Sequence, residues 1–210
     1  MKWNTNEPMI DKRGYLIERD INILLDEAKK WSDRDYALIL THWLTGRRVS
    51  EIVRGTKGTG IRVKDIDFDN KNITYNILKK KKPKRVTLPA NPFLLDVLDN
   101  YIKRNRLDPE YFIFPITRQR AFQIIKRHAK MSGVTTASGK VPSSHKFRHT
   151  FAIEIMRQEN ARPEDMIQLK ELLQHSSINI TMFYLLFGDT RARELVKNLN
   201  TESDKKDDSN

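Results

Sequence analysis

Residues 73–88 read ITYNILKKKKPKRVTL. Every second residue of the first part is apolar, starting at Ile73, and apolar Val86 and Leu88 resume the alternation after a basic turn. A period of two residues is typical of a strand with one buried face. The stretch therefore predicts two antiparallel strands joined by a hairpin.

A third strand is predicted just before this hairpin. Ile66 and Phe68 alternate with charged neighbours, and the run Asn70-Lys71-Asn72 is a turn signal between them and Ile73. Residues 61–89 therefore predict a small antiparallel sheet of three strands. Because the rest of the chain has helical spacing, the predicted fold class is α+β and mainly helical.

The turn of the hairpin concentrates positive charge. No acidic residue occurs from Asn70 to Leu95. A charge run is usually a solvated face, but on a hairpin these side chains can reach a phosphodiester. The whole chain has a formal net charge of +12 and a pI of about 9.8, which indicates an anionic partner, most simply nucleic acid. The hairpin residues predicted to bind DNA are Lys80, Lys81, Lys82, Lys84 and Arg85.

Two helices are predicted upstream of the sheet, over residues 17–30 and 33–45, each with an apolar face. Gly46 suits the end of the second helix, and Ser50 suits the N-cap of the next. Arg48 then lies in the turn between two packed helices, where it can be aimed at a ligand. The alternative is one of two adjacent surface arginines.

The part of the chain after the sheet is also predicted to be helical. Asn91-Pro92 starts one helix, because proline suits the first helical position. Thr117 caps another helix, which carries Phe122, Ile125 and Ala129 on one face. Its outer face holds a basic stripe that either faces DNA or serves solubility only: Arg118, Arg120, Lys126, Arg127 and Lys130.

Three more helices are predicted, from His145 to Met156, from Pro163 to about Gln174, and over roughly residues 189–199. The first of them places His145 and Arg148 about one turn apart on one face. The last has an apolar face that packs either on its own domain or on a neighbouring protomer.

Length and composition limit the class of protein. One domain is predicted over residues 14–200, between a flexible segment at 1–13 and a disordered tail at 201–210. The absence of cysteine excludes disulfides, thiolate metal sites and cysteine nucleophiles. No apolar stretch approaches the ~18 residues needed to span a membrane, and the N-terminus has no hydrophobic signal region. We therefore expect a cytoplasmic protein without membrane contact.

Five residues in a fixed order carry the predicted chemistry: Arg48, His145, Arg148, His175 and Tyr184. Each arginine offers a planar fork of donors that matches phosphate oxygens, and each histidine can hold or move a proton near neutral pH. A tyrosine hydroxyl can act as a covalent nucleophile. This set can attack a DNA phosphate without a metal, so no metal and no cofactor are predicted.

At these residues the chain resembles the catalytic domain of the tyrosine recombinase (phage integrase) family, over roughly residues 15 to 190. The run from Thr45 to Glu51 is similar to the family's T-G-x-R-x-S-E box, and the run from His145 to His149 matches its H-x-x-R-H box. Leu173-Gln174-His175-Ser176-Ser177 resembles the family's L-G-H-S-S run. Tyr184 follows nine residues after the histidine of that run, as the family's nucleophile does.

The resemblance implies a role for each arginine and histidine. Arg48 and Arg148 would hold the phosphate, and His175 would donate a hydrogen bond to it. His145 would be either the base for the nucleophile or a phosphate ligand. Glu51 would hold the histidine or arginine network, and we interpret His149 as supporting or structural.

The resemblance also implies a catalytic lysine that protonates the leaving 5′ oxygen. Aligning the predicted strands without gaps selects Lys79, while Lys80 to Lys82 stay open because hairpin length varies. The implied partners are double-stranded DNA and other copies of the chain in a tetrameric synapse. Cleavage and rejoining would pass through a 3′-phosphotyrosine at Tyr184, without ATP.

Two departures from the family are visible. Gln174 stands where the family usually has glycine, which predicts a different backbone before His175. The family's separate N-terminal DNA-clamping domain has no counterpart in the dozen or so residues before the first predicted helix.

Three other interpretations of the sequence compete with that of a recombinase. A type IB topoisomerase has similar chemistry but usually carries lysine where this chain has His145. A non-catalytic DNA-binding protein of the same fold would not need the complete set of five residues. A purely structural basic helical protein would form no covalent adduct with DNA.

Overall fold

A computed structural model describes residues 16–55, 59–79, 82–136, 139–158, 162 and 164–174. The chain divides into two compact units, residues 1–151 and residues 152–210. The segments predicted at 1–13, 189–199 and 201–210 lie outside the described residues.

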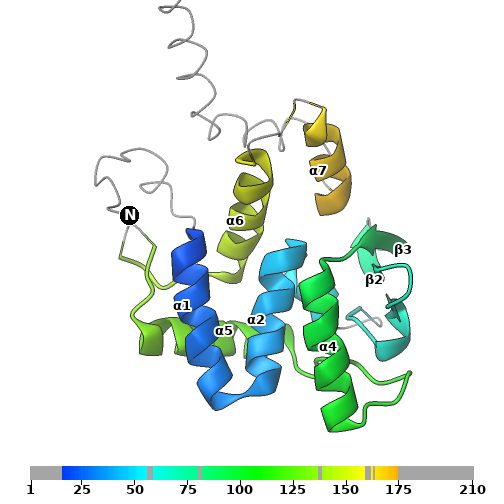
Figure 1. The fold of residues 1–210 in the computed structure, drawn as a ribbon, viewed down its shortest axis with the longest axis horizontal. Helices are drawn as coiled ribbons and strands as arrows, with labels where there is room; N and C mark the ends of the chain where they lie inside the picture. Colours follow the sequence, from blue (N-terminus) through cyan, green and yellow to red (C-terminus); the bar gives the residue numbers. More distant parts are fainter. Residues whose placement is uncertain are drawn as a thin grey trace, which may run out of the picture. The chain divides into compact units, whose positions relative to one another are not determined.

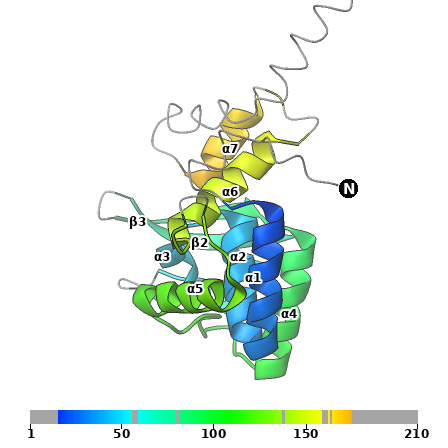
Figure 2. The same cartoon turned by 90° about the vertical axis from the view of Figure 1, so that its left-hand side faces the viewer.

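Helix α2 is the centre of the first unit. It spans Asp33–Thr45 and lies between α1, Glu18–Trp31, and α4, Pro92–Asn105 (Figure 1). Helix α5, Arg118–Ser132, crosses this layer and packs on α1 and α2 (Figure 2). All residues from 37 to 42 are buried, so α2 is enclosed on more sides than the single apolar face that the sequence predicts.

Polar caps set the helix boundaries. Ser32 ends α1 and begins α2, where its hydroxyl accepts a hydrogen bond from the Asp35 amide at 3.3 Å. Asn91 and Thr117 cap α4 and α5 in the same way, as their sequence positions predict. Gly46 ends α2 with a φ of 57°, a left-handed conformation that glycine adopts without steric cost.

The sheet has three antiparallel strands in the order β1-β2-β3, as predicted. These are β1, Ile66–Asp67, β2, Asn72–Lys79, and β3, Lys82–Pro89. Ile73 pairs with Leu88 and Tyr75 with Val86, so the alternating apolar residues share the face that joins the core. Only β1 is shorter than expected: Phe68 lies in the turn after it and is exposed.

Two predicted local features are wrong. Ser50 does not cap the third helix, because α3, Val49–Ile52, has Arg48 as its N-cap. The carboxylate of Glu51, at the third position of the helix, accepts the backbone amide of Arg48 at 3.1 Å, while no side chain of the N-cap residue caps the helix.

Phe122 is not on the buried face of α5 but is 40% exposed. Ile125 and Ala129 are buried as predicted, but Ala121 takes the place expected for Phe122. The buried residues, which have the spacing of a single helix face, are Ala121, Ile124, Ile125, His128 and Ala129. The guanidinium of Arg118 covers the exposed ring at 5.8 Å from its centroid.

Helix α6, Ser144–Met156, begins in the first unit and ends in the second. In the second unit, α7, Asp165–Leu173, buries Met166, Leu169 and Leu173. A short 3-10 turn, η3, Val63–Asp65, precedes β1 in the first unit. None of the helices in the described ranges has the length and apolar character needed to cross a membrane.

Candidate functional site

Glu51 binds both the backbone amide and the guanidinium of Arg48. Its backbone amide donates to Glu51 Oε2, and its Nη1 donates to Glu51 Oε1 at 3.2 Å. Glu51 itself is buried, whereas the Arg48 side chain is 51% exposed. The arrangement aims a solvent-accessible guanidinium from a fixed position in the turn after α2.

Arg47, next to it, is completely buried, and sequence reasoning missed its role. Its Nη2 lies 2.6 Å from Glu51 Oε2, and its guanidinium lies over the ring of Tyr75 at 4.9 Å. Burial raises the pKa of Tyr75, so this ring stays neutral. No sequence signal separates Arg47 from its neighbour Arg48, because Arg47 lies in the turn between α2 and α3 and its partners come from the fold.

Arg148 is brought to the same turn from α6. It is buried, and its Nη1 donates to the carbonyl of Gly46 at 2.9 Å. Gly46 lies two residues before Arg48, so Arg148 contacts the turn that carries Arg48, although 100 positions separate the two arginines. This contact joins the two sequence boxes.

His145 lies in the same cluster. Its pKa is lowered by burial and by the charges of Arg148 and Arg48. Its ring meets that of His149 edge-on, with 4.9 Å between centroids. Burial, together with His145, lowers the pKa of His149 to about 4. Both rings are therefore neutral at pH 7, and a neutral imidazole can accept a proton.

His42, in α2, is a second residue that sequence reasoning missed. Its Nε2 lies 2.5 Å from the hydroxyl of Ser144, the first residue of α6, and its ring stacks on Phe147 at 5.2 Å. Burial lowers its pKa to about 4. His42 thus fixes the start of the helix that carries His145 and Arg148. Nothing in the sequence distinguishes it from other histidines in apolar surroundings.

The hairpin carries part of the predicted set. Lys79 ends β2 and pairs with Lys82 at the start of β3, while Lys80 and Lys81 lie outside the described residues. Lys84 is exposed. Arg85 is exposed too, but its Nη2 lies 3.3 Å from Oδ1 of buried Asp65.

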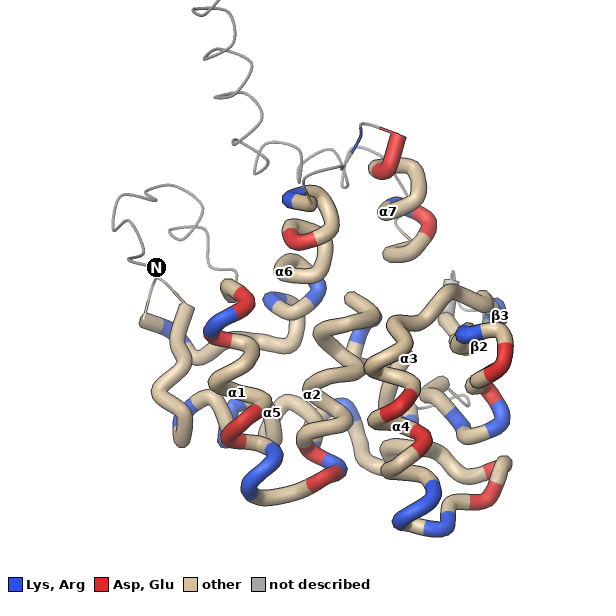
Figure 3. The backbone as a smooth tube through the Cα atoms, viewed as in Figure 1, with Lys and Arg blue, Asp and Glu red and all other residues tan. Residues whose placement is uncertain are grey.

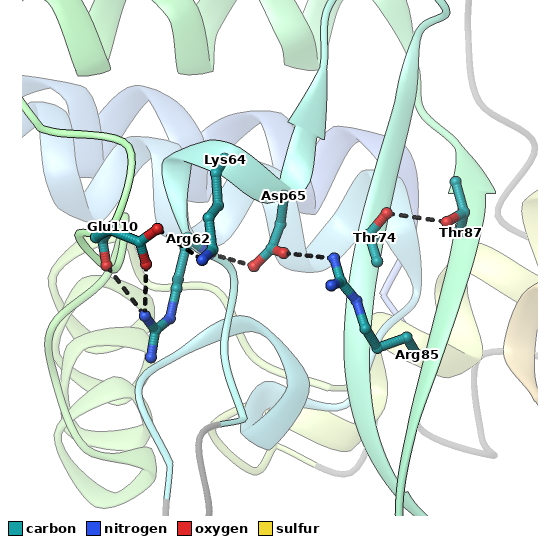
Figure 4. Close-up of polar contacts among 7 residues, drawn as sticks. All are labelled: Arg62, Lys64, Asp65, Thr74, Arg85, Thr87 and Glu110. Atoms are coloured by element: carbon teal, nitrogen blue, oxygen red, sulfur yellow. Dashed lines mark hydrogen bonds and ion pairs between the residues drawn. The ribbon is translucent and has the colours of Figure 1, made fainter.

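The Arg85–Asp65 pair belongs to a polar network that spans the sheet (Figure 4). Asp65 also accepts the backbone amide of Arg62 at 3.0 Å. Glu110 pairs with both Arg62 and Lys64, and the hydroxyls of Thr74 and Thr87 meet across β2 and β3 at 2.9 Å. The Arg85 contact therefore ties β3, the strand that leaves the hairpin, to the η3 turn before the sheet.

The basic stripe of α5 is exposed at every predicted position. Of the helices in the described ranges, α5 is the one with no acidic residue (Figure 3). Arg127 lies over the ring of Trp31 at 5.4 Å, and Arg120 donates to Gln123 at 3.2 Å. The stripe therefore presents five exposed basic side chains on a helix that carries no carboxylate.

His175 and Tyr184 lie outside the described residues. The residue before His175 is described: Gln174 has a φ of 54°, the left-handed conformation that glycine favours. The side chain of Gln174 therefore does not prevent a glycine-like conformation before His175, and a backbone that differs from the family's stays a prediction. Over the described residues, no group of three or more His, Asp or Glu side chains could hold a metal ion.

The chain is similar to known proteins over most of its length. A family model described as "Phage integrase family" matches residues 15–188. The tyrosine recombinase XerA of Pyrococcus furiosus is 25% identical over 194 residues, which cover 88% of this chain and 61% of that protein. The integrase of Haemophilus phage HP1 is 29% identical over 206 residues, which cover 93% of this chain and 53% of that protein.

Solved structures share the fold. The crystal structure of XerA recombinase matches with a TM-score of 0.67 and 22% identity, over 88% of this chain and 64% of that one. A lambda integrase tetramer bound to a Holliday junction matches with a TM-score of 0.61 and 16% identity, over 82% and 47%. The chain spans about half to three-fifths of the length of the curated relatives it matches.

Proposed function

Because the chain belongs to the phage integrase family, of tyrosine-type site-specific recombinases, we propose that it cleaves and rejoins DNA strands at specific sites through a covalent 3′-phosphotyrosine at Tyr184. The observation that carries the proposal is the hydrogen bond from Arg148 to Gly46, which brings two arginines and His145 to one turn. This constellation suits a phosphodiester, whose transition state concentrates negative charge on the non-bridging oxygens.

In the proposed reaction, Arg48 and Arg148 bind the non-bridging oxygens and His175 donates a further hydrogen bond. The Tyr184 oxygen attacks phosphorus and loses its proton, which neutral His145 is suited to accept. The phosphorus–5′ oxygen bond breaks, and Lys79 at the end of β2 protonates the leaving oxygen. A 5′ hydroxyl of another strand then reverses these steps, so rejoining consumes no ATP.

The proposed DNA contacts come from the hairpin and from α5. Lys80, Lys81, Lys82 and Lys84 would follow the backbone near the cleaved bond, with Arg85 shared between DNA and Asp65. The α5 stripe would bind phosphates further away. By analogy with the lambda integrase tetramer, we propose a tetramer on DNA. We propose a cytoplasmic location as well, because the proposed substrate is DNA.

A nicked suicide substrate tests the proposal. Once Tyr184 has attacked, the short fragment that carries the 5′ hydroxyl diffuses away. The protein then stays attached to the 3′ phosphate and gives a denaturation-resistant band. We expect this band with wild type, with or without EDTA, and no band with Tyr184→Phe, which should still bind DNA. A band of unchanged intensity from the Phe variant would reject Tyr184 as nucleophile. Relaxation of supercoiled plasmid without site preference would instead favour a type IB topoisomerase.

A further inference from the structure

Glu51 is shared by two arginines that differ in exposure. Oε2 lies 2.6 Å from Arg47 Nη2, where both side chains are buried, and Oε1 lies 3.2 Å from Arg48 Nη1, where the arginine is half exposed. One carboxylate therefore has a fixed cation on its inner side and an accessible cation on its outer side.

Arg47 cannot leave this carboxylate easily. Its guanidinium is covered by the ring of Tyr75, which comes from the core face of β2. A planar guanidinium stacked on an aromatic face is held by dispersion and by the charge of the ring face. Arg48 has no comparable cover, since its side chain is 51% exposed.

The difference matters when Arg48 moves to an anion. A buried carboxylate that loses its only cation is strongly destabilised. If Arg48 were the only partner of Glu51, binding a phosphate would strand the carboxylate, and Glu51 would compete with the phosphate for Arg48. Because Arg47 stays beside Glu51, Arg47, Arg48 and Glu51 together carry a formal charge of about +1. Arg48 and Glu51 alone would sum to zero, so the presence of Arg47 favours binding of an anion.

We propose that Arg47 is a positioning residue: by neutralising Glu51 from the buried side, it frees Arg48 to bind a phosphate while Glu51 still aims Arg48. Only the identity of the anion, a DNA phosphodiester, rests on the proposed function. The charge relation among the three side chains does not.

The test measures how fast phenylglyoxal modifies Arg48 in the full chain, read by peptide mass spectrometry. Arg104 is the internal reference, because it is exposed and paired with Asp33, away from this cluster. Inorganic phosphate is the probe anion, and the phosphate concentration that halves the Arg48 rate is measured in parallel. The variants are Arg47→Met, Glu51→Gln and the double variant Arg47→Met/Glu51→Gln, which restores the wild-type sum of charges.

We expect Arg47→Met to slow modification of Arg48 by about fivefold, the range of a partly exposed ion pair, and to weaken protection by phosphate by a similar factor. The double variant should regain the wild-type rate of Arg48 modification and the wild-type protection by phosphate. Should Arg47→Met fail to fold, the comparison moves to Glu51→Gln and the double variant, whose rates should agree within about twofold, because Arg47 acts only through Glu51.

Unchanged Arg48 reactivity in folded Arg47→Met would overturn the proposal, as would a double variant that stays slow. If wild type forms no covalent adduct with DNA, the proposed function fails, yet these rates still decide the role of Arg47. If adducts form, their single-turnover rates should follow the same order as the Arg48 reactivities.

Discussion

At the scale of single residues, the burial of His42 makes the folding stability depend on pH. Its pKa of about 4 lies below the ordinary 6.5 because the ring is enclosed between α2 and the start of α6. An unfolded chain takes up the proton near pH 6.5, whereas the folded chain resists it down to about pH 4. Folding stability is therefore complete above pH 6.5 and falls as the pH drops through this window.

We expect His42 to remove up to about 3 kcal/mol of unfolding free energy between pH 7 and pH 4. Urea denaturation at several pH values measures the total loss, to which His149 and carboxylates also contribute. His42→Gln, which keeps a partner for Ser144 but does not titrate, should show a smaller loss over the same range. Equal losses in both proteins would contradict a neutral, buried His42.

Arg48 and Arg148 should differ in what their removal does to stability. Each alanine variant should slow strand cleavage by roughly 10²–10³-fold, the loss typical of one preorganised donor. Arg148→Ala should also cost about 1–3 kcal/mol of unfolding free energy, because it leaves the Gly46 carbonyl without its buried donor.

Arg48→Ala should cost less than about 1 kcal/mol, since Glu51 keeps Arg47. Thermal unfolding and single-turnover cleavage separate the two effects, with Arg104→Ala as an exposed control. If both variants unfold alike, the buried contact of Arg148 has been misassigned.

Sequence reasoning reached Arg48, His145 and Arg148 because they fall in motifs with known spacing. It could not reach Arg47, since an arginine is ordinarily a surface residue and only the fold supplies the ring of Tyr75 and the buried side of Glu51. His42 was missed for the related reason that its partner, Ser144, lies 102 residues away.

At the scale of elements, short-range signals predicted most of the fold. Caps such as Asn91 and Thr117 act within one helical turn, so sequence alone identified the starts of α4 and α5. The errors arose where contacts beyond these short-range signals decided the structure. The Glu51 carboxylate fixes Arg48 as the N-cap of α3 by accepting its amide, and the packing of α5 on α1 selects a buried stripe that excludes Phe122.

The end of α7 allows a test at this scale. Gln174 has a φ of 54°, which costs a residue with a Cβ roughly 1–2 kcal/mol. Its side chain recovers part of this by donating to the Glu171 carbonyl at 2.7 Å. Gln174→Gly should therefore raise the unfolding free energy by about 0.5–1 kcal/mol.

The matched control for Gln174→Gly is Gly133→Ala at the end of α5, where φ is 71° and no atom would meet the added Cβ. That substitution should destabilise by about 1 kcal/mol through backbone strain alone. Denaturation curves of both variants measure the two effects, and destabilisation by Gln174→Gly would mean that the side-chain contact outweighs the strain.

At the scale of the whole molecule, positive charge is unevenly distributed. Helices α1, α2 and α4 carry both acidic and basic residues, whereas all charged residues of α5 are basic (Figure 3). A net charge of +12 attracts DNA from any side, and α5 adds a helix whose charged residues are all basic.

We expect DNA affinity to fall linearly in a plot of log affinity against log salt, with a slope of roughly −0.9 for each phosphate contacted. Replacing Lys126, Arg127 and Lys130 by alanine should flatten the slope by up to about 2.7. The matched control replaces Lys103, Arg104 and Arg106 at the end of α4, which removes the same charge and should leave the slope unchanged. Equal flattening by both triple variants would indicate attraction by net charge alone.

The link between Leu16 and Thr150 bears on how the chain is made. The Thr150 hydroxyl accepts the Leu16 amide at 3.0 Å and donates to the Leu16 carbonyl at 3.1 Å, across 134 positions. At about 5–20 residues per second, a ribosome adds Thr150 on the order of ten seconds after Leu16. During that interval the backbone of Leu16, just before α1, lacks its Thr150 partner. The first unit therefore completes its packing only after α6 has been synthesised. We expect a nascent chain stalled earlier to expose apolar helix faces that chaperones bind.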